Sequence, residues 1–119
     1  QNKSYIFDSP CETASYCSGL MQQAINAGFT VYLVAVWAQK QTCKDRAMSR
    51  AVDTGRYTPP TFISQTWHSI DTAKAFKNLA LVAHKSFVFD NDGATVQKIY
   101  ESGVLNCSLA QSACAYFAP

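Results

Sequence analysis

The segment FTVYLVAVWA, residues 29–38, constrains the fold more than any other part of the chain. It is apolar almost throughout, which is typical of a strand buried on both faces of a parallel sheet. Residues 11–28 precede it with apolar side chains at helical spacing and end in Asn-Ala-Gly, a good helix stop. Before them, SYIFD at residues 4–8 predicts a short strand that ends at an acid. Strand, helix, glycine and buried strand make a βαβ unit, so we expect a parallel sheet.

The rest of the chain continues the alternation of helices and strands. Residues 40–53 predict a polar helix that a glycine ends, and two prolines then allow a new helix reaching about residue 83. Residues 85–90 predict another strand of the parallel sheet, residues 94–102 an antiparallel hairpin strand, and residues 108–117 a short helix. We therefore expect a single but incomplete three-layer α/β domain over residues 1–119, with one long sheet edge open toward a partner.

Composition limits the classes of partner. The chain has a net charge of +2, and charged residues make up only 15% of it. This charge is too small to indicate binding to nucleic acid, and no apolar run reaches the roughly 18 residues of a membrane helix. Low charge and many aromatic residues favour a surface that other polypeptides cover. We expect a multi-subunit complex, with no nucleic acid partner and no transmembrane segment.

The five cysteines stand at positions 11, 17, 43, 107 and 114. Their odd number and scattered spacing are not typical of a disulfide framework, and no pair has the Cys-x-x-Cys spacing of a zinc site. We expect reduced cysteines in an α/β core, no metal, and a reducing intracellular or organellar compartment rather than secretion. A bridge between Cys107 and Cys114 is the alternative if the compartment is oxidising.

Several segments, in order, resemble the zeta-toxin-like P-loop kinases. They are YIFDSP, a helix, AGFTVYLVAVWA, DRAMSRAVDTGRYTPPTFI and FKNLALVAHKSFVFDNDG. In that family a strand ending in an acid precedes a helix, an AGY-V-L strand follows, and a lid with spaced arginines ends in a Gly-[HR]-x-Val-Pro turn. A helix with an Asn-Leu step and a strand ending in YDN-G complete the pattern. The resemblance covers residues 4–103 and implies a P-loop-kinase-like fold with its lid at about residues 40–60.

The resemblance implies catalytic roles for four residues. Asp8 takes the place of the strand-end carboxylate that faces the substrate, where the family usually has Glu. Arg46 and Arg50 fall on the lid helix, whose arginines reach the transferring phosphate. Arg56 takes the place of a basic residue or His before the lid turn.

The resemblance also implies binding positions outside the lid. Asp90 and Asn91 match the loop that comes near the nucleotide base. After the lid the family often carries a basic, aromatic run that grips an anionic substrate, whereas this chain has SQTWHSIDT without an arginine. That departure argues against the usual substrate, a nucleotide-activated sugar. Trp67 and His68 in this segment fit core packing better.

Each candidate residue also has an interpretation that requires no chemistry. Arg46 and Arg50, four residues apart, share one helix face and fit solvated surface groups as well as a lid. Asp8 fits a strand-end acid that caps the following helix. The acids of residues 90–92 fit a turn, because Asp-Asn-Asp-Gly lacks the rest of a calcium loop.

The largest departure from the family concerns the phosphate cradle. Such kinases hold the β- and γ-phosphates in a Gly-rich loop ending in Gly-Lys-Ser/Thr, and this chain contains no G-x-x-x-x-G-K. We expect the chain alone to bind no cofactor, and ATP with Mg²⁺ to bind only if another piece supplies the loop. The function that follows is a degenerate kinase-like domain serving as a non-catalytic structural or accessory subunit. The alternatives are the C-terminal half of an active ATP-dependent phosphotransferase and a small independent binding domain.

Overall fold

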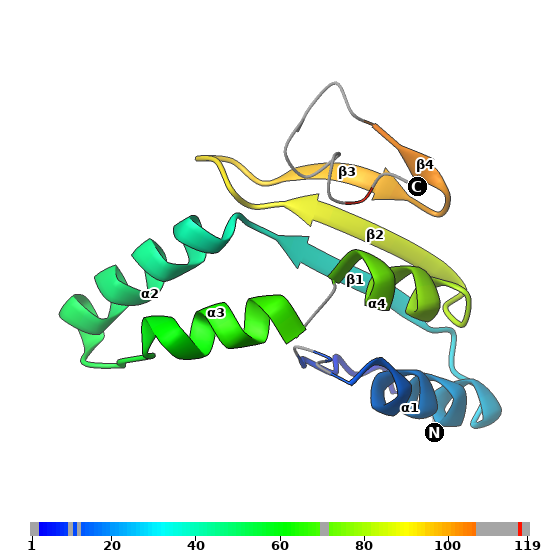
Figure 1. Cartoon of the computed structure of the whole chain (residues 1–119). Helices are drawn as coiled ribbons and strands as arrows, with labels where there is room; N and C mark the ends of the chain where they lie inside the picture. The colour runs from blue at the N-terminus through cyan, green and yellow to red at the C-terminus, as the bar shows by residue number, and fades with distance from the viewer. Residues whose placement is uncertain (1–2, 10, 12, 70–71, 107–116, 118–119) are drawn as a thin grey trace.

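A computed structural model describes residues 3–9, 11, 13–69, 72–106 and 117 (Figure 1). The elements follow in the order α1 (Ala14–Asn26), β1 (Tyr32–Trp37), α2 (Lys40–Thr54), α3 (Pro60–Ser69), α4 (Thr72–Ala80), β2 (Lys85–Asp90), β3 (Gln97–Glu101) and β4 (Val104–Leu105). The strands form one sheet in the order β1-β2-β3-β4. Within these ranges no helix has the length and apolar character needed to span a bilayer.

The first two strands form the parallel pair that the sequence predicts. β1 and β2 run in a register that places Tyr32 beside Lys85 and Trp37 beside Asp90. Parallel neighbours need a long crossover, and here α2, α3 and α4 provide it. The predicted strand at residues 85–90 is confirmed with the same bounds.

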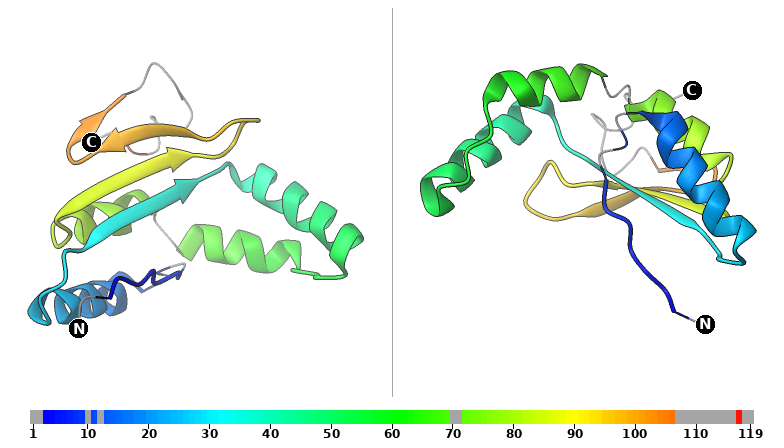
Figure 2. Two further views of the ribbon diagram at one scale, coloured as in Figure 1. Left: turned by 180° about the vertical axis from the view of Figure 1, so that it is seen from behind. Right: turned by 90° about the horizontal axis from the view of Figure 1, so that it is seen from below.

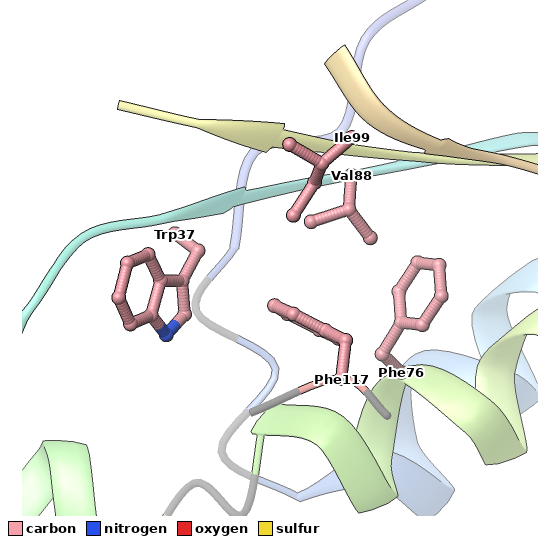
Figure 3. Close-up of a cluster of buried hydrophobic side chains, with 5 residues drawn as sticks. All are labelled: Trp37, Phe76, Val88, Ile99 and Phe117. Atoms are coloured by element: carbon pink, nitrogen blue, oxygen red, sulfur yellow. The ribbon is translucent and has the colours of Figure 1, made fainter. Parts of the chain in front are cut away.

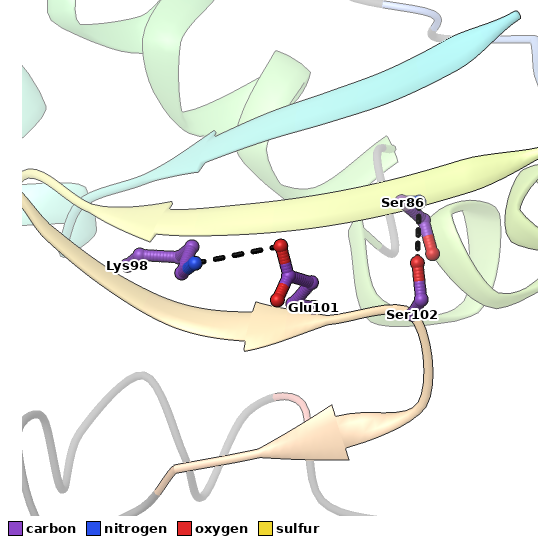
Figure 4. A network of polar contacts seen from close by, with 4 residues as sticks. All are labelled: Ser86, Lys98, Glu101 and Ser102. Atoms are coloured by element: carbon purple, nitrogen blue, oxygen red, sulfur yellow. Dashed lines mark hydrogen bonds and ion pairs between the residues drawn. The ribbon is translucent and has the colours of Figure 1, made fainter.

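The hairpin strand predicted within residues 94–102 is also confirmed, as β3. β3 is antiparallel to β2 and to β4. The turn from β3 to β4 places Ser102 and Gly103 at positive φ, as a two-residue hairpin turn requires. The Ser86 amide of β2 donates to the Ser102 hydroxyl at 3.3 Å, and Lys98 pairs with Glu101 at 3.4 Å on β3 (Figure 4).

One face of the sheet carries the hydrophobic core. Helices α1 and α4 lie over this face (Figure 2). Val88 of β2 and Ile99 of β3 have no exposed surface. The cluster around them consists of Trp37, Phe76, Val88, Ile99 and Phe117 (Figure 3). The ring of Phe76 meets that of Phe117 edge to face, with centroids 5.8 Å apart.

The opposite face of the sheet is uncovered within the described residues. On β1, the side chains of Tyr32, Val34 and Val36 are 59%, 56% and 61% exposed. No helix drawn in Figure 2 lies on their side of the sheet. The described residues therefore form two of the three expected layers, the sheet and one layer of helices.

The strand predicted for residues 4–8 is wrong. Residues 3–9, which we call the arm, have no helical or strand structure. Tyr5, Ile6 and Phe7 are 64%, 95% and 57% exposed, and the ring of Tyr5 meets Phe29 edge to face at 5.4 Å. The prediction fails because an apolar, β-prone segment becomes a strand only when it is hydrogen-bonded to a neighbour.

The prediction of reduced cysteines is wrong for one pair. Cys11 and Cys17 form a disulfide, whereas Cys43 is a free thiol. Helix α1 starts between the bridged residues and brings their Cα atoms to 5.8 Å, which is within the reach of a disulfide. The alternative pair, Cys107 and Cys114, lies outside the described residues.

The single helix predicted up to about residue 83 is two helices. α3 packs against α2 away from the sheet, whereas α4 packs on the sheet beside α1 (Figure 1). One straight helix cannot contact both surfaces. The helix axis therefore changes direction from α3 to α4, although apolar residues keep their helical spacing in the sequence. The helix predicted at residues 108–117 lies outside the described residues, apart from Phe117.

Replacing Ile99 tests the position of the core. We expect Ile99→Ala to lower the free energy of unfolding by about 2–5 kcal/mol, because the substitution leaves a cavity in a close-packed site. Val96→Ala, at a residue that is 59% exposed, should change it by less than about 0.5 kcal/mol. Urea unfolding of both variants measures the difference, and equal losses would contradict this core.

Candidate functional site

The candidate site lies where β1 and β2 end. Helix α2 starts at this edge, and the loop of residues 91–93 leaves β2 beside it (Figure 1). Ligands of open α/β sheets bind outside the carboxyl ends of the parallel strands. The site therefore occupies the position that the fold favours for function.

The parallel hydrogen-bond ladder changes its partners at this edge. The Asn91 amide donates to the Trp37 carbonyl at 2.8 Å. A regular parallel ladder would next take the Gln39 amide to the Asn91 carbonyl. Instead the Gln39 amide donates to Oδ1 of Asp92 at 2.9 Å. The side chain of Asp92 thereby takes over the pairing where the strands diverge.

Asp92 caps helix α2 from another part of the chain. Gln39 stands at the N-cap position, and its own side chain makes no capping hydrogen bond. The Asp92 carboxylate accepts from the Gln39 amide and from Thr42 in the first turn. The Asp92 amide in turn donates to Oδ1 of Asp90 at 2.8 Å, which holds the loop in a tight turn.

The electrostatics of the cap follow from these contacts. The hydrogen bond from Thr42, then the bond from the Gln39 amide and the nearby Arg46 guanidinium, lower the pKa of Asp92. A carboxylate at a helix N-terminus also meets the positive end of the helix dipole. Asp92 therefore stays ionised and holds the first turn of α2 at neutral pH.

Arg46 ties the same helix to the same loop. Its Nη1 donates to the Asn91 carbonyl oxygen. Its Nη2 donates to the carbonyl oxygens of Asp92 at 3.2 Å and of Gly93 at 3.4 Å. The Arg46 guanidinium thus donates to the Asn91 carbonyl, to which the Gln39 amide would donate in a regular parallel ladder. We call the contacts of Arg46 and Asp92 together the interlock.

The other two predicted lid arginines lie farther from the sheet. Arg50 is one helical turn beyond Arg46 on α2, roughly 6 Å along the axis. Arg56 follows Gly55, which ends the helix with φ of +73°. Both residues are exposed, and neither guanidinium makes a hydrogen bond or ion pair within the described part of the chain. The roles that the resemblance implies for them stay predictions.

Trp67 of α3 packs at the base of the α2–α3 hairpin. Its Nε1 donates to the Ala38 carbonyl at 3.4 Å, and the Lys40 ammonium lies 5.3 Å from the centre of its ring. The ring is half-buried. These contacts agree with the packing interpretation of Trp67, while the His68 side chain lies outside what the structure describes.

Asp8 does not join this edge of the sheet. It belongs to the arm and is exposed. Its carboxylate makes no hydrogen bond or ion pair within the described part of the chain. Asp90 and Asn91 do lie at the site, where Asp90 accepts from the Asp92 amide and Asn91 joins β1 to Arg46. The structure thus brings Arg46, Asp90 and Asn91 together and leaves Asp8 apart.

Sequence reasoning missed two participants in the site. Asp92 was interpreted only as part of a turn, because its partners Gln39 and Thr42 are about 50 residues away. Cys43, the free thiol, lies in the same turn of α2, with Sγ 3.9 Å from the Ala38 carbonyl. Burial raises the pKa of this thiol, which makes it less reactive. Within the described ranges, no three His, Cys, Asp or Glu side chains gather as metal ligands would.

Comparison with models of protein families matches most of the chain. The model of the Zeta toxin family matches residues 1–104. No curated protein and no solved structure matches the chain. The match spans both sides of the interlock, from the arm through α2 to β4.

Removing the Asp92 carboxylate tests the cap. At neutral pH we expect Asp92→Ala to lower the free energy of unfolding by about 1 kcal/mol, as loss of an N-cap does. Because the pKa of Asp92 is lower in the folded state, its contribution is present above the ordinary value of 3.8 and is lost as the pH falls below it. Thermal unfolding of wild type and variant from pH 7 to pH 2 measures this, and their difference should shrink below pH 4. Asp53→Ala, at the other end of α2, is the control and should not lower stability.

Neutralising Arg46 tests the second half of the interlock. We expect Arg46→Gln to lower the free energy of unfolding by about 1–2 kcal/mol, because it removes charge-assisted hydrogen bonds to three carbonyls. Arg50→Gln, one turn along the same face, should change it by less than about 0.5 kcal/mol. Equal effects in urea unfolding would show that Arg46 is an ordinary surface residue.

Proposed function

This chain belongs to the zeta toxin family, and we propose that it acts as a non-catalytic, kinase-like domain that serves as a structural or accessory subunit of a larger assembly. Family membership supports the P-loop-kinase-like architecture. Proteins that share a fold can differ in chemistry, because activity depends on the side chains at the site. The proposal therefore rests on what the lid residues of this chain do.

The observation that carries the proposal is the use of the Arg46 guanidinium. Lid arginines stabilise the charge that develops as a phosphoryl group is transferred, so their donors must point at that group. In this chain Arg46 instead donates to the carbonyls of residues 91–93. Moving it to a phosphate would leave those carbonyls without their donor and loosen the start of α2. A lid held in this way favours a framework role over a catalytic one.

Two further observations support the proposal. No G-x-x-x-x-G-K occurs in the 119 residues, and backbone amides and the lysine of that loop supply most contacts to the β- and γ-phosphates. Asp8, the expected carboxylate toward the substrate, is exposed in the arm and apart from the interlock. The lack of a phosphate-loop motif in these 119 residues and the position of Asp8 apart from the interlock both support a non-catalytic role.

The accessory role is supported by the uncovered side of the sheet. β1 is the first strand of the sheet, and no other strand pairs with its outer edge within the described residues. Three large side chains on its free face are more than half exposed. Monomeric proteins rarely leave an apolar strand edge unprotected, because it pairs readily with other chains. Docking on another polypeptide would cover this edge.

A second function is favoured by Arg50 and Arg56. Their exposed guanidinium groups are available to an anion, and Arg is suited to binding phosphate. With a phosphate loop supplied by another piece, the chain would act as the C-terminal half of an ATP-dependent phosphotransferase. ATP and Mg²⁺ would then bind at the carboxyl ends of β1 and β2, near Asp90 and Asn91.

Nucleotide binding separates the two functions. We expect calorimetry of the 119-residue chain with ATP and Mg²⁺ to show no binding tighter than about millimolar, because a few lid arginines do not replace a preorganised loop. We also expect no phosphate transfer from ATP. An Arg50→Gln, Arg56→Gln double variant is the control for weak ionic binding and should abolish any residual signal. Micromolar affinity that survives in this variant would contradict the non-catalytic role.

A further inference from the structure

Two strand-forming segments of this chain lack a strand partner within the described residues. One is the outer edge of β1, and the other is the arm, residues 3–9, with Tyr5, Ile6 and Phe7 exposed. Each segment offers the backbone hydrogen-bond donors and acceptors that the other lacks. An open edge accepts an extended segment through main-chain hydrogen bonds, with alternate side chains giving specificity.

The hydrogen bonds of β1 show which backbone groups remain available at its edge. The Trp37 carbonyl accepts from Asn91, so odd-numbered residues of β1 face β2. Successive residues of a strand alternate in direction. The amide and carbonyl groups of Tyr32, Val34 and Val36 therefore face the open edge. Within the described residues, these groups leave three donors and three acceptors for a new strand.

The arm has the length and composition of the missing strand. Its seven residues span roughly 23 Å when extended, and the six residues of β1 span roughly 20 Å. Tyr, Ile and Phe at its centre are strong strand formers. Ile6 is 95% exposed, which makes it the most exposed large apolar side chain of those described. Lys3 and Asp8 bracket this apolar centre and give the strand polar ends.

We infer that the arm of one copy pairs with the β1 edge of a second copy, and that the reciprocal exchange forms a two-fold dimer. This inference rests on the proposed accessory role and names its partner as another copy of the chain. Exchange of an identical element between two copies closes the assembly, because each copy gives one arm and accepts one. Both open edges are then covered, and further growth stops.

The course of the arm favours a second copy over its own sheet. No backbone hydrogen bond joins the arm to β1 within the described residues, and Figure 1 draws the arm apart from that strand. At its root, the disulfide between Cys11 and Cys17 ties the chain to α1. Beyond this tether, the ring contact of Tyr5 with Phe29 is the one aromatic contact that the described arm makes. The apolar centre of the arm is therefore free to reach another molecule.

Matched substitutions test the two halves of the contact by sedimentation of the full 119-residue chain. We expect wild type to be a dimer. Ile6→Lys should weaken dimerisation by roughly tenfold or more, because it places a charge in an apolar strand pair. Leu81→Lys, at a residue that is 87% exposed, makes the same change elsewhere and should leave the dimer intact.

The edge is tested by proline at a backbone position that does not pair with β2. Val34→Pro removes an amide that faces the open edge, which a sheet tolerates only at such positions. We expect a folded monomer, with Val34→Thr as the dimeric control and circular dichroism as the check on folding. Mixing Ile6→Lys with Val34→Pro should restore a heterodimer, because one chain keeps its edge and the other keeps its arm.

Several results would overturn the inference. A wild-type monomer at all concentrations would do so, as would a dimer that Val34→Pro abolishes and Ile6→Lys leaves intact, since this indicates pairing between two β1 edges. A monomer whose Tyr32, Val34 and Val36 amides resist hydrogen exchange would show that the arm folds back on its own sheet. None of these results touches nucleotide binding, so the inference and the non-catalytic role fail separately.

Discussion

The orientation of the α2–α3 hairpin depends on one exchange of hydrogen bonds at the end of the parallel strand pair. Where β1 and β2 diverge, the Asp92 carboxylate takes the Gln39 amide, and the Arg46 guanidinium takes the Asn91 carbonyl. Each side chain replaces a bond that the backbone ladder would otherwise make, so the start of α2 is held to the loop without a continuous sheet. Trp67 then packs at the base of the hairpin. Because both bonds are exposed, water replaces a lost partner, and removing either side chain costs only the net contribution of its hydrogen bonds.

The same exchange connects the architecture to the proposed function. The chain belongs to the zeta toxin family, in which the resemblance places phosphate-facing arginines on the lid. A guanidinium whose donors are used by the framework does not offer them to the charge that develops during phosphoryl transfer. Arg50 and Arg56 are exposed and lie farther along the hairpin than Arg46, toward the turn between α2 and α3. This arrangement supports the proposal that the lid serves as structure and that the uncovered β1 edge serves assembly.

Local patterns in the sequence predict most of the elements, but neither all of their partners nor the division of the long helix into α3 and α4. The apolar run of residues 31–38 and the strand at residues 85–90 predict the parallel pair, because continuous apolar runs are typical of parallel strands. The burial on both faces that this run predicts is wrong for β1 within the described residues, because Tyr32, Val34 and Val36 are exposed. The arm has an equally β-prone sequence, yet pairing is a property of two segments and cannot be read from one. The same limit applies to the site. Helical spacing places Arg46 on a face of α2, whereas its contact with residues 91–93 and the cap by Asp92 depend on segments about 50 residues apart.

The state of the Arg46 guanidinium tests this account most directly. In nitrogen-15 NMR of the labelled chain, a guanidinium held by three carbonyls rotates slowly and gives separate, slowly exchanging Nη signals. We predict such signals for Arg46 alone among Arg46, Arg50 and Arg56, unchanged when ATP and Mg²⁺ are added. Averaged signals for all three arginines, or Arg46 signals that shift on addition of the nucleotide, would contradict the claim that this chain uses its lid arginine as part of the framework.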